Sequence, residues 1–185
     1  MDTIGFPGRA ALRAWLDAHA ATAPELWVRL RKKGHGESVT WDDCVVEALR
    51  VGWIDAAKRP EGEATWLQRL VPRRPRGTWS RRNVQHAERL IAAGEMTPAG
   101  LAQVEAARAD GRWAAAYAGA AAAEVPADFL AALEGRPAAK AAFAGLRKAD
   151  LYAIHHRLHT AARPETRARR LEALLARLET QGRVH

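Results

Sequence analysis

The chain has 185 residues and a formal net charge of +8, and this length supports one sizeable core or a compact domain with an appendage. Its single cysteine, Cys44, excludes an internal disulfide and favours a reducing compartment. The sequence has neither a secretory signal nor an apolar stretch long enough to span a membrane, so we expect a cytoplasmic protein.

The N-terminal part of the chain changes between helical and strand periodicity. Apolar residues at helical spacing predict a helix over 8–20, and alternating apolar residues predict a strand over 25–33. Thr40 and Asp43 have the spacing of a capping box, which predicts the start of a helix. Gly52 is suited to end that helix, because glycine readily adopts a left-handed conformation.

Two strands and two further helices follow. The patterns of residues 53–58 and 64–71 predict an antiparallel pair of strands. Two prolines and a glycine exclude regular structure from 72–78. Ser80 and Thr97 are each placed to cap a further helix.

An alanine-rich segment, 114–123, precedes the C-terminal part and fits either a helix or a linker. Prolines then stand where short helices would begin, and helices are predicted over 126–133, 137–146, 148–162 and 164–179. The sequence therefore predicts an α+β fold. A small, mainly antiparallel sheet with packed helices is expected in residues 1–115, and a helical C-terminal region in residues 116–185.

The segment 64–87 is strongly basic, with six arginines and no Asp or Glu. Guanidinium groups match phosphate and carboxylate geometry, and a helix that begins after Ser80 would point free N–H groups at the same loop. We therefore expect an anion-binding site. Its candidate residues are Lys33, Trp53, Asp55, Arg69, Arg73, Arg74, Trp79, Ser80, Arg82 and Asn83. In the alternative interpretation, Trp79 only packs against the helix start and the arginines are solvated or paired with acids.

Two other function classes remain open. The chain could be an enzyme acting on a small anionic substrate, with Asp55 or Glu47 as acid/base and Lys33, Arg73 and Arg74 as anchors. It could also bind nucleic acid nonspecifically through arginine and tryptophan side chains. The sequence lacks a phosphate loop, a dinucleotide fingerprint and a nucleophile elbow, so no cofactor and no catalytic residue is assigned.

Two C-terminal patterns have a structural interpretation. His155 and His159 have a spacing that can hold a metal, but the sequence offers no third ligand, so we expect histidines without a metal. In the C-terminal helix, Arg167, Arg169 and Arg170 could extend the basic surface. Arg169 also follows Glu165 at the spacing of a helical ion pair, and we expect that pair to form.

Several stretches resemble one bacterial family: LWVRLRKKG, EALRVGWIDAAKR, QRLVPRRPRGTWSRRN and AARPETRARR. On these residues the chain is similar to the YdeI/OmpD-associated (OmdA-like) proteins, also called bacteriocin-protection proteins, with an OmdA-like region over 116–185. The resemblance implies a cytoplasmic, non-catalytic binding protein in stress or bacteriocin tolerance. From the basic segment, an anionic small molecule or a protein is the expected partner, and the oligomeric state is left open.

Overall fold

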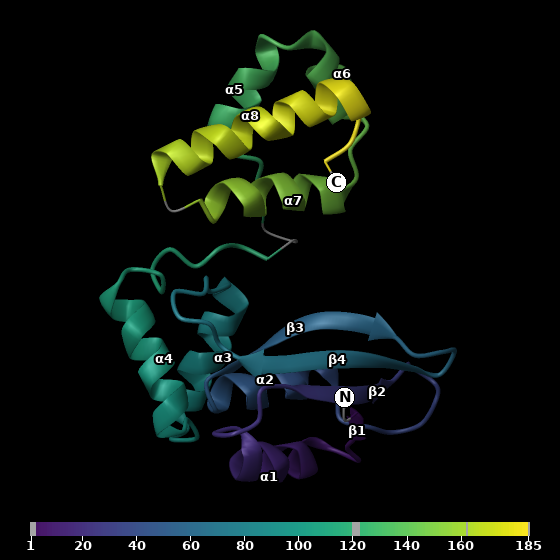
Figure 1. Ribbon diagram of the computed structural model, residues 1–185, viewed down its shortest axis with the longest axis vertical. Coiled ribbons are helices and arrows are strands. Elements are labelled where there is room, and N and C mark those ends of the chain that lie inside the picture. The colour runs from purple at the N-terminus through teal and green to yellow at the C-terminus, as the bar shows by residue number, and fades with distance from the viewer. Residues whose placement is uncertain (1–2, 120–122, 162, 185) are drawn as a thin grey trace. The chain divides into compact units, whose positions relative to one another are not determined.

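The computed structural model describes residues 3–119, 123–161 and 163–184. The chain divides into two compact units, Met1–Ala116 and Tyr117–His185, which we call the N-terminal and the C-terminal unit. Each unit has its own buried hydrophobic residues. Figure 1 shows strands and helices in the N-terminal unit and helices in the C-terminal unit.

The N-terminal unit contains a four-stranded sheet with helices packed beside it. The strands are β1 (Thr3–Gly5), β2 (Leu26–Arg31), β3 (Trp53–Pro60) and β4 (Thr65–Pro72). The helices are α1 (Arg9–His19), α2 (Trp41–Arg50), α3 (Arg81–Ala92) and α4 (Pro98–Ala109). The strand order is β1-β2-β4-β3, and only the β1–β2 pair is parallel. These elements confirm the predicted α+β fold with a mainly antiparallel sheet.

Helix α2 joins the two cores of the N-terminal unit. Its buried Cys44 and Ala48 pack in one cluster with residues of α1 and the sheet. Its Val45 and Leu49 pack in a second cluster with residues of α3 and α4. Residues one apart in a helix face different directions, so a single helix serves both cores.

Capping signals in the sequence set several helix boundaries. Thr40 and Asp43 form the predicted capping box at the start of α2. Ser80 accepts a hydrogen bond from the Asn83 N–H at the start of α3, and Thr97 accepts one from the Gly100 N–H at the start of α4. These side chains satisfy N–H groups that have no partner within the helix.

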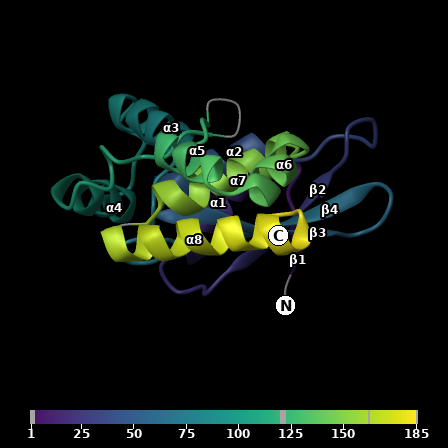
Figure 2. The same cartoon turned by 90° about the horizontal axis from the view of Figure 1, so that it is seen from above.

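The C-terminal unit is helical. It contains α5 (Ala127–Glu134), α6 (Pro137–Ala144), α7 (Lys148–His159) and α8 (Pro164–Gln181). Both views show α8 lying along the other three helices (Figures 1 and 2). Its core is formed by Phe129, Leu133, Ile154, Leu158, Leu174, Leu175 and Leu178. This arrangement confirms the predicted helical C-terminal region.

The alanine-rich segment is not helical where the structure describes it. Residues 114–115 belong to a turn, and 116–119 contain no helix. Residues 120–122 of the segment lie outside the described residues. Within the part of the chain that the structure covers, no helix is long and apolar enough to cross a membrane.

Candidate functional site

Residues 73–80 connect β4 to α3, and we call them the arginine loop. Arg73 and Trp79 hold its two ends together. The Arg73 guanidinium carbon lies 3.9 Å from the centre of the Trp79 ring, and its Nη1 donates a hydrogen bond of 3.0 Å to the Thr78 carbonyl. Both side chains are buried. A stacked and desolvated guanidinium over an indole is a stabilising arrangement, so these two residues fix the loop from inside.

Arg69 and Arg82 are each paired with a carboxylate. The Arg69 Nε donates to Glu25 over 2.7 Å, and the hydrogen bonds from Arg69 and Trp27 lower the pKa of Glu25. Arg82 is paired with Asp42. The positive charge of both arginines is therefore partly neutralised within the protein.

Trp53 and Asn83 are buried, and Ser80 has a capping role. The Trp53 indole N–H donates to the Ala20 carbonyl over 3.1 Å, and its ring is 2% exposed. Asn83 is 8% exposed on α3. A ligand at the protein surface could not contact the Trp53 ring without moving the core.

Asp55 lies opposite Leu70 in the β3–β4 pair. Its negative charge contributes, together with Asp43, to raising the pKa of the buried Cys44, although burial is the main cause. The raised pKa, about 12, keeps the Cys44 thiol protonated.

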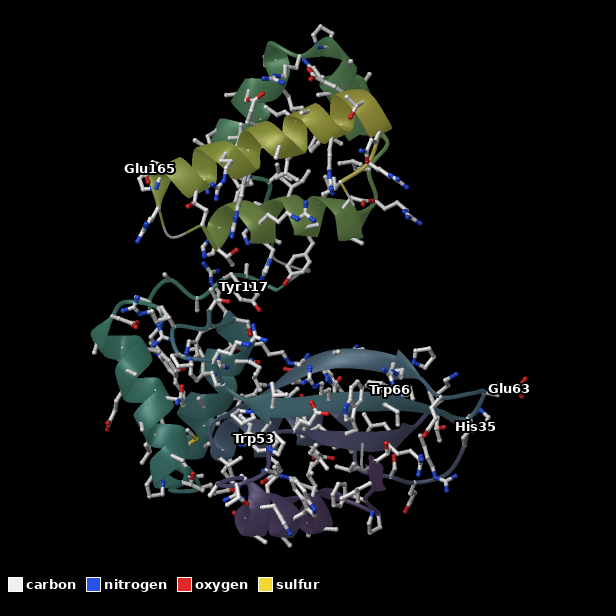
Figure 3. All side chains as sticks on the ribbon, in the orientation of Figure 1. His35, Trp53, Glu63, Trp66, Tyr117 and Glu165 are labelled. Carbon is white, nitrogen blue, oxygen red and sulfur yellow. The ribbon has the colours of Figure 1, made fainter. Side chains whose placement is uncertain are left out.

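The sheet register separates Lys33 from the arginine loop. Lys33 follows Arg31, which pairs with Thr65 at the first residue of β4, whereas Arg73 and Arg74 follow its last residue, Pro72. The length of β4 therefore separates Lys33 from Arg73 and Arg74 by roughly 23 Å along the strand. In Figure 3, His35 of the loop after β2 lies at the same end of the sheet as Glu63 of the β3–β4 turn. The ten predicted residues therefore do not meet in one place, and Arg74 is exposed at the loop.

A different group of residues forms a concave basic surface at the Lys33 end. The Lys58 ammonium lies 5.2 Å from the centre of the Trp41 ring and 5.3 Å from that of Trp66. Trp41 and Trp66 line a groove of about 380 Å³, which we call the Trp41–Trp66 groove. Arg82 also lies over Trp41, with 4.4 Å between the guanidinium carbon and the ring centre.

The groove is lined by more cations than carboxylates. Its charged lining residues are Arg31, Lys32, Lys33 and Glu37. Arg31 donates to the His35 carbonyl over 2.8 Å, and Lys32 donates to the Gly62 carbonyl over 2.9 Å. These carbonyl partners orient the side chains but do not cancel their charge. Positive charges clustered at a concave surface raise the local concentration of anions.

Glu47, one of the two predicted acid/base candidates, is fully buried and bound by three arginines. Its carboxylate accepts hydrogen bonds from Arg9 at 2.6 Å, from Arg13 at 2.9 and 3.0 Å, and from Arg50 at 2.8 Å. Burial alone would raise the pKa of Glu47, but these hydrogen bonds outweigh it and lower the pKa. A carboxylate that accepts these four hydrogen bonds has no lone pair left to take a proton from a substrate. Glu47 is therefore a poor general base.

The C-terminal histidines pack with aromatic rings. The rings of His155 and His159 stack with 5.3 Å between their centres, and His155 Nδ1 bonds to the Glu124 carbonyl. Among the residues that the structure describes, no group of three or more His, Cys, Asp or Glu side chains could hold a metal.

The predicted pair of Glu165 and Arg169 is wrong. No ion pair joins these two side chains in the described chain, whereas Arg167 binds the Asp128 carboxylate through two hydrogen bonds of 2.7 and 2.9 Å. A partner supplied by α5 gives a bidentate geometry that a neighbour on the same helix does not provide.

Two family models match the chain. Residues 4–103 match the family described as Domain of unknown function (DUF8412). Residues 122–181 match the family described as Bacteriocin-protection, YdeI or OmpD-Associated. No curated protein and no solved structure matches the chain.

Proposed function

Because the chain belongs to the DUF8412 family and its residues 122–181 match the YdeI/OmpD-associated family, we propose that it is a non-catalytic binding protein. The N-terminal unit binds a small polyanion in the Trp41–Trp66 groove. Positive charge comes from Arg31, Lys32 and Lys33, which line the groove. Lys58 adds to it from its position over the Trp41 and Trp66 rings.

The observation that carries this proposal is the position of Lys58. Its ammonium lies over two indole rings that line the groove, while its side chain is exposed. Aromatic faces attract a cation without neutralising it. The ammonium is therefore held in place and keeps its charge for a ligand, and ordering it beforehand reduces the entropy lost on binding.

The cations that lie over Trp41 and Trp66 make a small anion a better ligand for the groove than single-stranded nucleic acid. Nonspecific single-strand binding uses aromatic faces on which bases stack. Trp41 is already contacted by Lys58 and Arg82, and Trp66 by Lys58. A base would have to displace these cations before it could stack.

The biological setting is proposed from the family match. A match to a bacteriocin-protection family over residues 122–181 supports a role in bacteriocin or stress tolerance. The lone buried Cys44 is in keeping with the reducing environment of the cytoplasm, where we propose that the protein acts.

Isothermal titration calorimetry at low ionic strength tests the groove, with tripolyphosphate as the probe. We expect saturable binding that weakens as salt is added. Lys58→Gln should weaken it by about tenfold, the effect expected for the loss of a hydrogen bond between charged groups. Lys33→Gln should act in the same direction.

Arg74→Gln is the matched control, because Arg74 is an exposed cation of the arginine loop outside the groove. It should leave the affinity for tripolyphosphate unchanged. A loss of affinity in Arg74→Gln with none in Lys58→Gln would place the site at the arginine loop and overturn the groove. Tighter binding of an oligothymidylate than of tripolyphosphate would favour nucleic acid instead.

A further inference from the structure

Helices α7 and α8 enclose a second basic concavity, in the C-terminal unit. It has a volume of about 470 Å³, within the range of small-molecule sites. Helix α7 contributes His156 and Arg157, its C-cap residue is Thr160, and α8 contributes Arg170, Ala173, Leu174 and Arg177. The α8 residues have the spacing of a single helical face, so all four point the same way. We call this concavity the α7–α8 pocket.

The α7–α8 pocket contains three arginines, Arg157, Arg170 and Arg177, and hydrogen bonds to neutral oxygens orient them. Arg170 Nη1 donates to the Arg157 carbonyl over 2.8 Å and to the Thr160 hydroxyl over 3.2 Å. Arg157 and Arg177 each donate through Nη1 to the Val184 carbonyl over 3.3 Å. Each guanidinium has five N–H groups, so most of the donors remain available for a ligand.

The carboxylates of this unit that form ion pairs are bound to other cations. Glu172 and Glu179 pair with Arg136, and Asp128 pairs with Arg167. Within residues 123–161 and 163–184, no carboxylate forms an ion pair with Arg157, Arg170 or Arg177. The pocket therefore carries a concentrated positive charge that other described side chains do not cancel.

His156 adds a neutral polar group to the wall of the pocket. Its burial, together with the positive charge around it, lowers the pKa of the imidazole. The ring of Tyr117 meets it edge-on, with 4.8 Å between ring centres. Leu174 and Ala173 give the pocket an apolar part beside the guanidinium groups.

We propose that the α7–α8 pocket binds a phosphate monoester with a small apolar body. A phosphate dianion offers several oxygens to the forked donors of guanidinium groups, which bind phosphate bidentately. The apolar wall at Leu174 then accepts the organic part of the ester. All the residues involved belong to the C-terminal unit, so this site is separate from the Trp41–Trp66 groove.

Calorimetric titration of the full chain with phenyl phosphate, inorganic phosphate and phenol tests this proposal. Phenyl phosphate should bind saturably and more tightly than inorganic phosphate, and phenol should show no binding. Arg177→Gln and Arg157→Gln should each weaken phenyl phosphate binding by about tenfold or more. Arg170→Gln should act likewise, and thermal unfolding of each variant checks that it folds.

Arg169→Gln is the matched control, because Arg169 is an exposed arginine of α8 outside the pocket. It removes the same charge from the same helix and should leave the affinity unchanged. Equal losses in Arg169→Gln and Arg177→Gln would overturn the proposal, as would the absence of saturable binding. If Arg170→Gln does not fold, Arg157→Gln and Arg177→Gln decide the result.

Lys58→Gln separates this site from the groove. It should leave phenyl phosphate binding unchanged while it weakens tripolyphosphate binding. Loss of phenyl phosphate binding in Lys58→Gln, with none in Arg177→Gln, would assign the ligand to the groove and contradict the α7–α8 pocket.

Discussion

Glu47 and Arg50 lie one turn apart on α2, and their buried side chains are joined by a hydrogen bond of 2.8 Å. Arg50 also binds Asp17, and Arg13 binds both Glu47 and Glu95. The network ties α1 to α2 and to the segment after α3. Removing one partner of such a network leaves buried charge without compensation.

We expect Glu47→Gln to lower the free energy of unfolding by about 3–5 kcal/mol, because Arg9, Arg13 and Arg50 would lose their shared carboxylate. Urea denaturation at pH 7 measures the change. Glu88→Gln is the matched control, since Glu88 is exposed on α3, and it should change the free energy by less than about 0.5 kcal/mol.

The stability supplied by Glu47 should depend on pH. The pKa of this carboxyl is lowered in the folded protein from its ordinary value of 4.5. Its contribution is therefore present above pH 4.5 and is lost as the pH falls through the folded-state pKa. The difference in the free energy of unfolding between the wild type and Glu47→Gln should narrow when urea denaturation is repeated at pH values below 4.5. A stability difference that does not change with pH would contradict an ionised Glu47 carboxylate in the folded protein.

Gly100 allows the start of α4 to approach the end of α2. The Thr97 N–H and hydroxyl both donate to the Arg50 carbonyl, over 3.1 and 3.0 Å. A Cβ at Gly100 would lie 2.2 Å from that carbonyl oxygen. We expect Gly100→Ala to destabilise the N-terminal unit by about 1–3 kcal/mol, as overpacking does. Gly5→Ala, which meets nothing within 4 Å, is the control for thermal unfolding and should be close to neutral.

Cys44 should be unreactive in the folded protein. It has no exposed surface, and burial raises the pKa of its thiol to about 12. A disulfide reagent at pH 8 should modify it only after unfolding in guanidinium chloride, because the thiolate is the reactive form. Because burial penalises the thiolate, the raised pKa lowers the stability of the fold as the pH rises above the ordinary thiol pKa of 9.0. Rapid modification of the native protein would contradict this placement.

Arg167 and Asp128 should be energetically coupled, and Arg169 and Glu165 should not be. A double-mutant cycle on the first pair, read by chemical denaturation, should give a coupling of about 0.5–1 kcal/mol, as measured for exposed pairs. The same cycle on the second pair is the control and should give no coupling, because no ion pair joins those side chains in the described chain. Equal couplings would contradict the arrangement of α5 beside α8.

Local signals in the sequence were sufficient for much of the secondary structure. The capping box at Thr40 and Asp43 and the left-handed Gly52 are formed by residues close together in the chain. Strand β1 was not predicted, because three residues, Thr3–Gly5, are too few to show alternation. Its parallel pairing with β2 depends on contacts distant in the sequence.

The site could not be predicted in the same way. The separation of Lys33 from Arg73 follows from the register of β2 on β4, which no local pattern specifies. A bulge between Asp55 and Lys58 places Lys58, in place of Ala57, opposite Gln68. Strict alternation would have turned Lys58 to the other face, away from Trp66.

The position of Lys58 over two indoles has a spectroscopic consequence. Tryptophan emission responds to a nearby charge, and this ammonium lies within 5.3 Å of the Trp41 and Trp66 ring centres. An anion bound at this ammonium would change the electric field at both rings and therefore their emission. The protein thus carries an intrinsic optical reporter at its N-terminal groove, and none at the α7–α8 pocket, which no tryptophan lines.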